Sequence, residues 1–399
     1  MTQGLLFTND SYPSPCRVNT MSRVDQTNFL SLEGFLRGLL HKKTLMFFGH
    51  LSKRSKFLWP RTKQLTVAKL SAGASNTDRD SSYSSSKRGE DRAYSEITAA
   101  NRSLLDRAKK VKSVCIVGAT GFVGQQLVTL LAKAERKQLL EILDQDVNFK
   151  ACLAKKDAVV NLAGAPIAGK RWSEAYKDEL ISSRVRVTQK IVEMIMSMDK
   201  EERPKVLINA SAVGYYGVSD SKEFDESSPP GDDFLAVLCR KWESAARQLD
   251  QSFGTRVVIL RFGIVVGSGG GVLGSMTPIF QMFLGGPVGT GRQWISWIQI
   301  MDLVNLIIRS ITDENMLGVF NACSPEPVTM NDFCETLGNI IGRPNWLPVP
   351  TFVIRAMLGE GSIVVLEGQR VYPSRTLASG FHFQYPNIYS ALEASINVS

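Results

Sequence analysis

The stretch Val114-Cys-Ile-Val-Gly118-Ala-Thr-Gly121-Phe-Val-Gly124 decides the fold. Its four leading apolar residues predict a short strand buried on both faces, and Phe122 to Lys133 predict the helix that follows. The first glycine allows a tight turn, the second lets the backbone approach a pyrophosphate, and the third lets the helix pack closely on the strand. A strand, glycine turn and helix in this order are typical of a site that binds a dinucleotide.

The same turn supplies most of the predicted cofactor contacts, because a helix N-terminus offers N–H groups and partial positive charge to phosphates. We predict contacts from Gly118, Thr120, Gly121, Phe122, Val123 and Gly124. A second motif, Asn161-Leu-Ala-Gly164, ends a predicted strand, where such sheets bind ligands. We therefore expect Ala163 and Gly164 to line the same crevice, the alternative being a tight turn without a ligand.

Further apolar runs and helical patterns alternate along the chain. The predicted strands are Ala158–Leu162, Val206–Ala210 and Arg256–Arg261, and the predicted helices between them are Ser173–Met198 and Leu235–Leu249. This alternation predicts an α/β protein, with a Rossmann-like doubly wound parallel sheet over residues 111–345. Beyond a proline-marked boundary, residues 346–399 predict a small C-terminal α+β appendage, with a helix at Thr351–Leu358 and an apolar run at Ile363–Leu366.

The first 110 residues differ in composition from the rest. They carry 19 basic and 9 acidic residues, a net charge of +10, whereas the remainder carries 28 and 29. A basic, hydroxyl-rich and acid-poor segment predicts a disordered N-terminal extension that acts as a transit peptide, or else a retained disordered tail or wrongly included upstream sequence. Because the folded part has no basic excess, we expect no nucleic-acid partner. No run approaches the roughly 18 apolar residues of a transmembrane helix, and peripheral membrane contact is left open.

A third motif, Asn209-Ala-Ser211-Ala-Val-Gly214-Tyr215-Tyr216-Gly217, supplies the candidate reacting groups. Ser211 can hydrogen-bond a substrate carbonyl, and Tyr216 can act as an acid if its pKa is lowered. The alternative is an aromatic loop that closes the sheet. No cysteine or histidine spacing fits a metal site, so we predict no bound metal.

These motifs, with Trp242-Glu243, Arg261-x-Gly263 and Trp294-x-Ser296-Trp297-Ile298, resemble the extended short-chain dehydrogenase/reductases. The chain looks most similar to their atypical epimerase-family branch, subfamily 39U, over roughly residues 111–397. That resemblance implies an NADP(H) or NAD site, a C-terminal domain of unknown function and an unidentified small-molecule substrate. Similarity to the plant members implies location in the chloroplast, with the mitochondrion as alternative, and a link to plastid division.

Two departures qualify the implied activity. Members of the wider superfamily use a Tyr-x-x-x-Lys pair, in which the lysine lowers the tyrosine pKa. Counted back from Trp242, those two places hold Leu235 and Cys239. The sequence therefore leaves two functions open: an oxidoreductase or epimerase-like enzyme, or a non-catalytic interaction protein with a degenerate cofactor site.

The second departure is length, since only 36 residues separate Gly124 from Asn161. We expect one further helix at about Leu139–Leu153 and no strand between Lys133 and Asp157, so a strand-helix-strand unit is predicted to be missing. The lost strand would normally carry the group that contacts the adenosine ribose, so either the gene model omits an exon or the adenosine half of the pocket is damaged.

Two further side chains are predicted to be structural. Asp302 is predicted to cap a helix, and Arg261 to support the edge of the sheet.

Overall fold

The computed structural model describes residues 102–134, 140–142, 149–249 and 251–396, which belong to one compact unit. Most of the predicted N-terminal extension lies outside these residues. Its predicted end at residue 110 is wrong, because residues 102–108 are helical and Leu104 and Ala108 are buried in the main core. The folded domain therefore begins at or before residue 102.

In the described part of the chain, six parallel strands form the central sheet in the order β10-β6-β4-β3-β1-β2. This sheet confirms the predicted Rossmann-like class. In chain order the strands are β1 (Val114–Val117), β2 (Leu140–Ile142), β3 (Ala158–Asn161), β4 (Val206–Ala212), β6 (Arg256–Phe262) and β10 (Gly318–Ala322).

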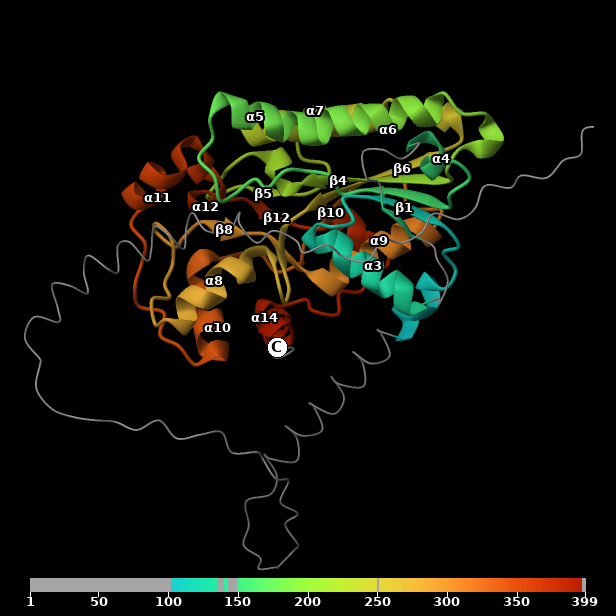
Figure 1. The fold of residues 1–399 in the computed structure, drawn as a ribbon. Coiled ribbons are helices and arrows are strands. Elements are labelled where there is room, and N and C mark those ends of the chain that lie inside the picture. The colour runs from blue at the N-terminus through green and yellow to red at the C-terminus, as the bar shows by residue number, and fades with distance from the viewer. Residues whose placement is uncertain (1–101, 135–139, 143–148, 250, 397–399) are drawn as a thin grey trace, which may run out of the picture. The chain divides into compact units, whose positions relative to one another are not determined.

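Helices cover both faces of this sheet (Figure 1). One face packs on α4 (Phe149–Leu153), α6 (Val187–Met196) and α7 (Phe234–Arg247). In the chain, α5 (Glu174–Ile181) precedes α6. The other face packs on α3 (Phe122–Ala134) and α9 (Ile300–Thr312). Neighbouring strand residues enter different layers: Val159 packs with the α6 side and Val160 with the α3 side. This alternation follows from the two-residue period of a strand, and buries both faces.

The segment between α3 and β3 corrects two predictions. The expectation of no strand between Lys133 and Asp157 is wrong, because the structure places β2 beside β1 there. The helix expected at Leu139–Leu153 is wrong for the same reason, and the described helix of this segment is α4, Phe149–Leu153. The sequence Leu-Glu-Ile is too short for its strand pattern to be recognised. In the described residues β2 is one of the two edge strands of the sheet, and β10 is the other.

Part of the C-terminal third forms a smaller layer below the sheet in Figure 1. Its core lies between α8 (Gly271–Gln281), α10 (Met330–Ile341) and α14 (Ile388–Ile396). The predicted helix Thr351–Leu358 is α11, and the apolar run is α12 (Ile363–Leu366), with α13 (Ser374–Ala378) beyond it. Outside the central sheet, the described residues form three strand pairs: β5 (Glu223–Phe224) with β12 (Arg370–Val371), β7 (Ile264–Val266) with β9 (Trp297–Gln299), and β8 (Trp294–Ile295) with β11 (Val328–Thr329).

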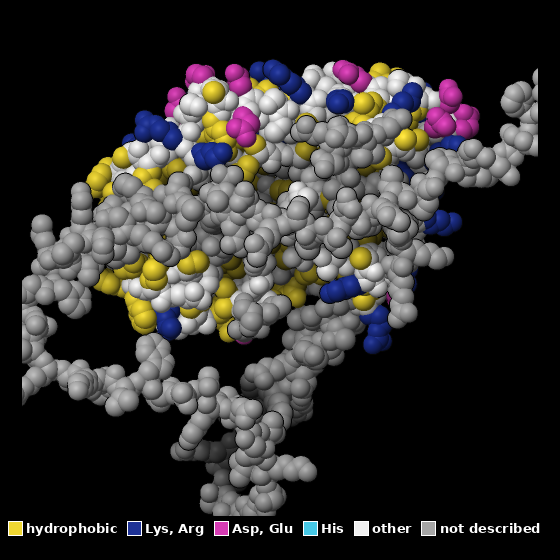
Figure 2. Space-filling model, viewed as in Figure 1, with side chains coloured by type: hydrophobic (Ala, Val, Ile, Leu, Met, Phe, Trp, Pro, Cys, Tyr) yellow, Lys and Arg dark blue, Asp and Glu magenta, His cyan; other side chains and the backbone are white. Residues whose placement is uncertain are grey.

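Short helices complete the described elements. A π-helix, η1 (Ser182–Arg186), joins α5 to α6, and 3-10 turns occupy Lys200–Glu202, Val213–Tyr216, Gln251–Phe253 and Gly359–Ser362. On the face shown in Figure 2, acidic and basic side chains are interspersed along α5 and α7.

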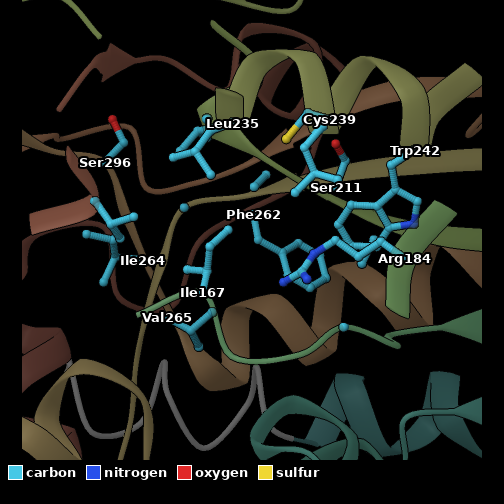
Figure 3. A pocket seen from close by; sticks show the side chains of 18 of the residues that line it. Ile167, Arg184, Ser211, Leu235, Cys239, Trp242, Phe262, Ile264, Val265 and Ser296 are labelled. Atoms are coloured by element: carbon cyan, nitrogen blue, oxygen red, sulfur yellow. The ribbon is translucent and has the colours of Figure 1, made fainter. Parts of the chain in front are cut away.

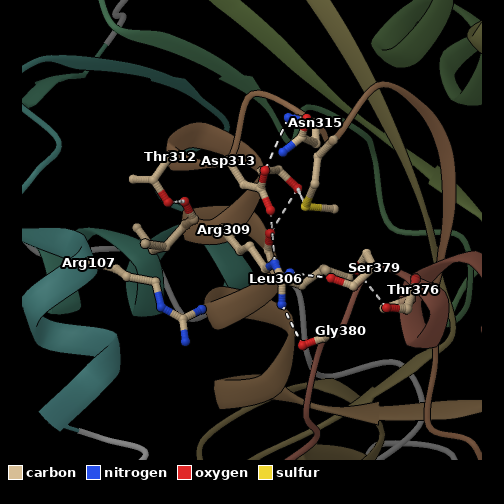
Figure 4. A network of polar contacts seen from close by, with 12 residues as sticks. Arg107, Leu306, Arg309, Thr312, Asp313, Asn315, Thr376, Ser379 and Gly380 are labelled. Atoms are coloured by element: carbon tan, nitrogen blue, oxygen red, sulfur yellow. Dashed lines mark hydrogen bonds and ion pairs between the residues drawn. The ribbon is translucent and has the colours of Figure 1, made fainter.

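Two side chains of α9 anchor the C-terminal segment. Arg309 donates to the carbonyl oxygens of Ser379 and Gly380 and pairs with Asp313 (Figure 4). Asp302 was predicted to be a helix cap, which is wrong, because Gln299 is the N-cap residue of α9. The buried Asp302 carboxylate instead accepts backbone N–H groups of Gln384 at 2.8 Å and Tyr385 at 3.0 Å.

Burial raises the pKa of Asp302 to about 7, although the two hydrogen bonds act in the opposite direction. Between about pH 4 and pH 7 the folded chain therefore holds a proton that the unfolded chain has lost. The free energy of unfolding contributed by Asp302 should fall as pH rises through this window, by at most about 1.4 kcal/mol per pH unit. Urea unfolding of the wild-type protein and of Asp302→Asn at four pH values tests this. The free energy of unfolding of the wild-type protein, relative to that of the variant, should fall as pH rises from about 4 to 7. A difference that stays constant would contradict it.

Candidate functional site

A cavity of about 460 Å³ opens above the carboxyl ends of β1, β3 and β4 (Figure 3). Most predicted site residues line it: Gly118, Gly121, Phe122, Val123, Gly124, Ala163, Gly164 and Ser211. Two do not. Thr120 is exposed and its carbonyl accepts a hydrogen bond from Gln125, and Tyr216 lies buried behind the cavity wall.

The turn between β1 and α3 admits only glycine at two places. Gly118 has a φ of +89°, and a Cβ there would lie 2.8 Å from the carbonyl oxygen of Leu162. A Cβ on Gly124 would lie 2.3 Å from the carbonyl oxygen of Gly118. The first turn of α3 contains no acidic residue. The turn therefore places an unblocked helix N-terminus against the cavity, which suits a phosphate.

The end of β3 is held by the buried Asn161 side chain. Its Nδ2 donates to Asn209 Oδ1 at 2.7 Å and to Thr188 Oγ1 at 2.8 Å, and its Oδ1 accepts the N–H of Ala163 at 3.2 Å. These bonds explain why an asparagine precedes the cavity-lining Ala163 and Gly164. The motif fixes the shape of the loop and leaves the ligand to contact its backbone.

Arg184 is a cavity-lining residue that the sequence analysis missed. It lies in η1 and is only 9% exposed, with its guanidinium donating to the carbonyl oxygens of Ala165 at 2.8 Å and Leu180 at 3.3 Å. A Cβ on Gly164 would lie 2.9 Å from its Cζ. In the described part of the chain it has no carboxylate partner, so it brings an uncompensated positive charge to the Gly164 end of the cavity. Burial lowers the pKa of Arg184, and an anion there would oppose that shift.

Ser211 joins a buried polar network. Its Oγ donates to Glu243 Oε1 at 2.8 Å, and Arg261 holds both oxygens of the same carboxylate at 2.7 and 2.9 Å. Arg261 also donates to Tyr216 Oη at 2.9 Å, and Tyr216 donates to Asn321 Oδ1 at 2.7 Å. The prediction that Arg261 supports the edge of the sheet is wrong, because β6 lies between β10 and β4; Arg261 instead ties together the network behind Ser211.

The predicted proton-transfer role of Tyr216 conflicts with this environment. Its hydroxyl is committed to Arg261 and Asn321, its ring stacks on Phe224, and burial raises its pKa well above the usual value of about 10. The role requires a lowered pKa and access to the cavity, and the structure provides neither.

Leu235 and Cys239 lie on α7 and line the cavity near Ser211 (Figure 3). They occupy the places that the superfamily resemblance assigns to the tyrosine and lysine. Burial raises the pKa of the Cys239 thiol to about 12, so this thiol is neutral at physiological pH. Neither residue can replace the missing acid–base pair.

The C-terminal part completes the cavity with Ile363, Val364, Glu367, Gly368 and Gln369. Ser296 fixes this segment, because its Oγ donates to the Gln369 carbonyl at 2.8 Å and accepts the Val371 N–H at 2.9 Å. A Cβ on Gly368 would lie 2.0 Å from the Trp294 carbonyl oxygen, so the two backbones meet too closely for any other residue. The sequence indicated only an apolar run at Ile363–Leu366, and nothing local indicated that Glu367, Gly368 and Gln369 reach the site.

A parallel sheet with a glycine turn after β1 and a cavity at the carboxyl ends of its strands defines a Rossmann dinucleotide-binding protein. The chain belongs to the NAD dependent epimerase/dehydratase family, which it matches over residues 114–323. Residues 349–395 match a domain of unknown function, DUF1731.

Relatives and solved structures agree with this assignment. The epimerase family protein SDR39U1 homolog, chloroplastic, of Arabidopsis thaliana is 44% identical over 71% of this chain and 86% of its own length. Human epimerase family protein SDR39U1 is 38% identical over 70% and 98%. The crystal structure of human SDR39U1 with NADPH has a TM-score of 0.67 and 36% identity, covering 71% of this chain and 99% of that one. A nucleoside-diphosphate sugar epimerase from Corynebacterium glutamicum has a TM-score of 0.60, with 26% identity over 75% and 62%.

Two further observations concern the described residues alone. None of their helices is long and apolar enough to cross a membrane. Nor do they contain a cluster of three or more His, Cys, Asp or Glu residues arranged to hold a metal ion.

Proposed function

We propose that this chain binds NADPH in the cavity and acts as an oxidoreductase or epimerase-like enzyme of the chloroplast. The observation that carries the proposal is the pairing of the glycine turn with Arg184, which fits a pyrophosphate from two sides. The human relative crystallised with NADPH supports the choice of cofactor, and the Arabidopsis relative named as chloroplastic supports the compartment. The mitochondrion remains the alternative compartment.

Each part of the cavity has a role in this proposal. Gly118, Gly121 and Gly124, with the backbone of Phe122 and Val123, cradle the pyrophosphate, and Ala163 and Gly164 let the cofactor lie against the loop after β3. NADPH, when bound, supplies a hydride. Ser211 is the remaining hydroxyl at the predicted catalytic position and orients a polar atom of the substrate, while Glu243 fixes its rotamer. Tyr216 is a positioning residue that acts through Arg261.

A second function is favoured by Leu235 and Cys239. Without an acid–base pair beside Ser211, the chain can keep the cofactor site and serve as a non-catalytic, NADPH-dependent interaction protein. A role in plastid division would belong to this second function, that of a non-catalytic interaction protein.

The first experiment is a titration of the purified protein with NADPH and NADH, followed by nicotinamide fluorescence. The proposal expects saturation, and no saturable binding below about 1 mM would overturn it. Turnover of NADPH with a panel of carbonyl compounds and sugar nucleotides then separates the two functions, because the interaction protein should show none. Normal plastid size after deletion of the gene would remove the division role.

Replacing Arg184 with glutamine should weaken NADPH binding by about tenfold to a hundredfold, since a charge-assisted contact to phosphate contributes roughly 1.5–3 kcal/mol. Arg186 lies in the same π-helix and is exposed, so Arg186→Gln is the matched control and should leave the affinity unchanged. Fluorescence titration at two salt concentrations measures both. Equal effects of the two substitutions would contradict the role of Arg184.

The proposed location predicts where the extension is removed. Because Leu104 is buried in the core, import cleavage must fall before residue 102 to leave the fold intact. Mass spectrometry of the N-terminus of the protein from isolated chloroplasts should find a start upstream of this residue but well beyond Met1. An intact Met1 would contradict cleavage.

A further inference from the structure

We infer that the molecule which shares the cavity with the cofactor is uncharged and largely apolar, and that it carries no diphosphate. This inference rests on the proposed function, because it assumes that the cofactor occupies the glycine turn. It concerns the substrate class, which the family name leaves open between nucleotide sugars and other compounds.

The charges around the cavity are unevenly placed. Of the described residues that line it, only Arg184, Asp233 and Glu367 are charged. Arg184 lies beside Gly164, where the cofactor pyrophosphate would be bound, and in Figure 3 it is across the cavity from Ser296. On the Ser296 side of the cavity, the Ser296 hydroxyl donates to the carbonyl oxygen of Gln369. Glu367, two residues earlier in the same segment, also lines the cavity. The side left for a substrate is therefore acidic.

The helix N-terminus on this side is already occupied. Helix α7 begins beside the cavity, and a free helix N-terminus there would be a natural phosphate site. Asp233 is its N-cap, however, and its Oδ1 accepts the N–H of Ala236 at 2.9 Å. The carboxylate satisfies the helix N-terminus and repels an incoming anion. A diphosphate, which carries about two negative charges, would find two carboxylates on this side and, among the described residues that line the cavity there, no cation.

The remaining surface is apolar. Leu235 of α7, Val218 beyond the Tyr216 turn and Ile264 of β7 line the cavity, and α12 adds Ile363 and Val364. Glu367 is half-buried and, among the residues that the structure describes, its carboxylate has no hydrogen-bond partner. A hydroxyl or another neutral donor on an otherwise apolar molecule would complement this carboxylate, whereas burial without a partner is unfavourable.

The test compares two probes that differ in their diphosphate alone. Isothermal titration of the NADPH-saturated full chain with geraniol and with geranyl diphosphate should show that the alcohol binds at least tenfold more tightly, and UDP-glucose should bind no better than the diphosphate. Glu367→Lys should lower the ratio of the affinity for geraniol to the affinity for geranyl diphosphate at least tenfold. Glu335→Lys makes the same charge change on an exposed face of α10 outside the cavity and should leave the preference unchanged.

The outcomes separate the two proposals. NADPH fluorescence, recorded first, reports cofactor binding by itself, and its failure would overturn the proposed function together with this inference. If NADPH binds but the diphosphate or UDP-glucose binds as tightly as geraniol, or geraniol does not bind, only the substrate class is overturned. The same holds if Glu367→Lys and Glu335→Lys behave alike.

Discussion

Gly124→Ala is expected to weaken NADPH binding at least a hundredfold, about 2.7 kcal/mol. The new Cβ would lie 2.3 Å from the Gly118 carbonyl oxygen and 2.7 Å from Ala119 Cα, and both contacts are with backbone. No side-chain rotation can relieve them, so α3 must move away from the turn. The helix N-terminus and the turn then no longer present their N–H groups to one pyrophosphate, and small displacements of such groups have large effects. Fluorescence titration with NADPH measures the loss.

Gly274→Ala provides the control for this substitution. Gly274 lies inside α8, where an added Cβ would have no atom within 4 Å. The same chemical change should leave NADPH affinity unchanged and raise the free energy of unfolding by roughly 0.5–1 kcal/mol, because alanine favours a helix over glycine. Urea unfolding of both variants separates lost binding from lost folding. An affinity of folded Gly124→Ala within threefold of the wild-type value would show that the turn does not hold the cofactor.

Features that depend on neighbouring residues could be predicted from the sequence. The glycine turn is one, since the strand, the three glycines and the helix follow one another within a few residues, and their steric requirements are local. The strand pattern of Val206–Ala210 and the helix at Thr351–Leu358 are others, and the structure confirms both. The short strand β2 could not be recognised, because three residues carry too little pattern.

The rest of the site depends on tertiary packing. Arg184 is one of several basic residues between Ser173 and Met198, and only the structure shows that it lies in a π-helix, Ser182–Arg186, and lines the cavity. Tyr216 was a reasonable candidate by position, but its direction is set by Arg261 and Asn321, which are 45 and 105 residues away. Glu367 reaches the cavity from a different part of the chain altogether. Side-chain direction and long-range contacts of this kind leave no local signal.

Arg261→Leu is expected to lower the free energy of unfolding by about 3–5 kcal/mol, because it leaves the Glu243 carboxylate buried without its bidentate partner. Glu243 and Arg261 are 1% and 2% exposed, whereas Arg247, the other cation on Glu243, is half-exposed. Arg247→Ala is therefore the matched control and should cost at most about 1 kcal/mol. Urea unfolding measures all variants.

The double variant Arg261→Leu with Glu243→Leu distinguishes a lost charge pair from lost packing. If the cost comes from an uncompensated buried charge, removing Glu243 as well should recover at least half of it. A double variant at least as unstable as Arg261→Leu alone would show that the network contributes mainly through its shape. In either case Ser211 loses the Glu243 carboxylate that fixes its hydroxyl. The folded double variant should still keep its NADPH affinity, because the glycine turn is intact. Any turnover found in the wild-type protein should fall in it, which would separate the role of Ser211 from that of the cofactor site.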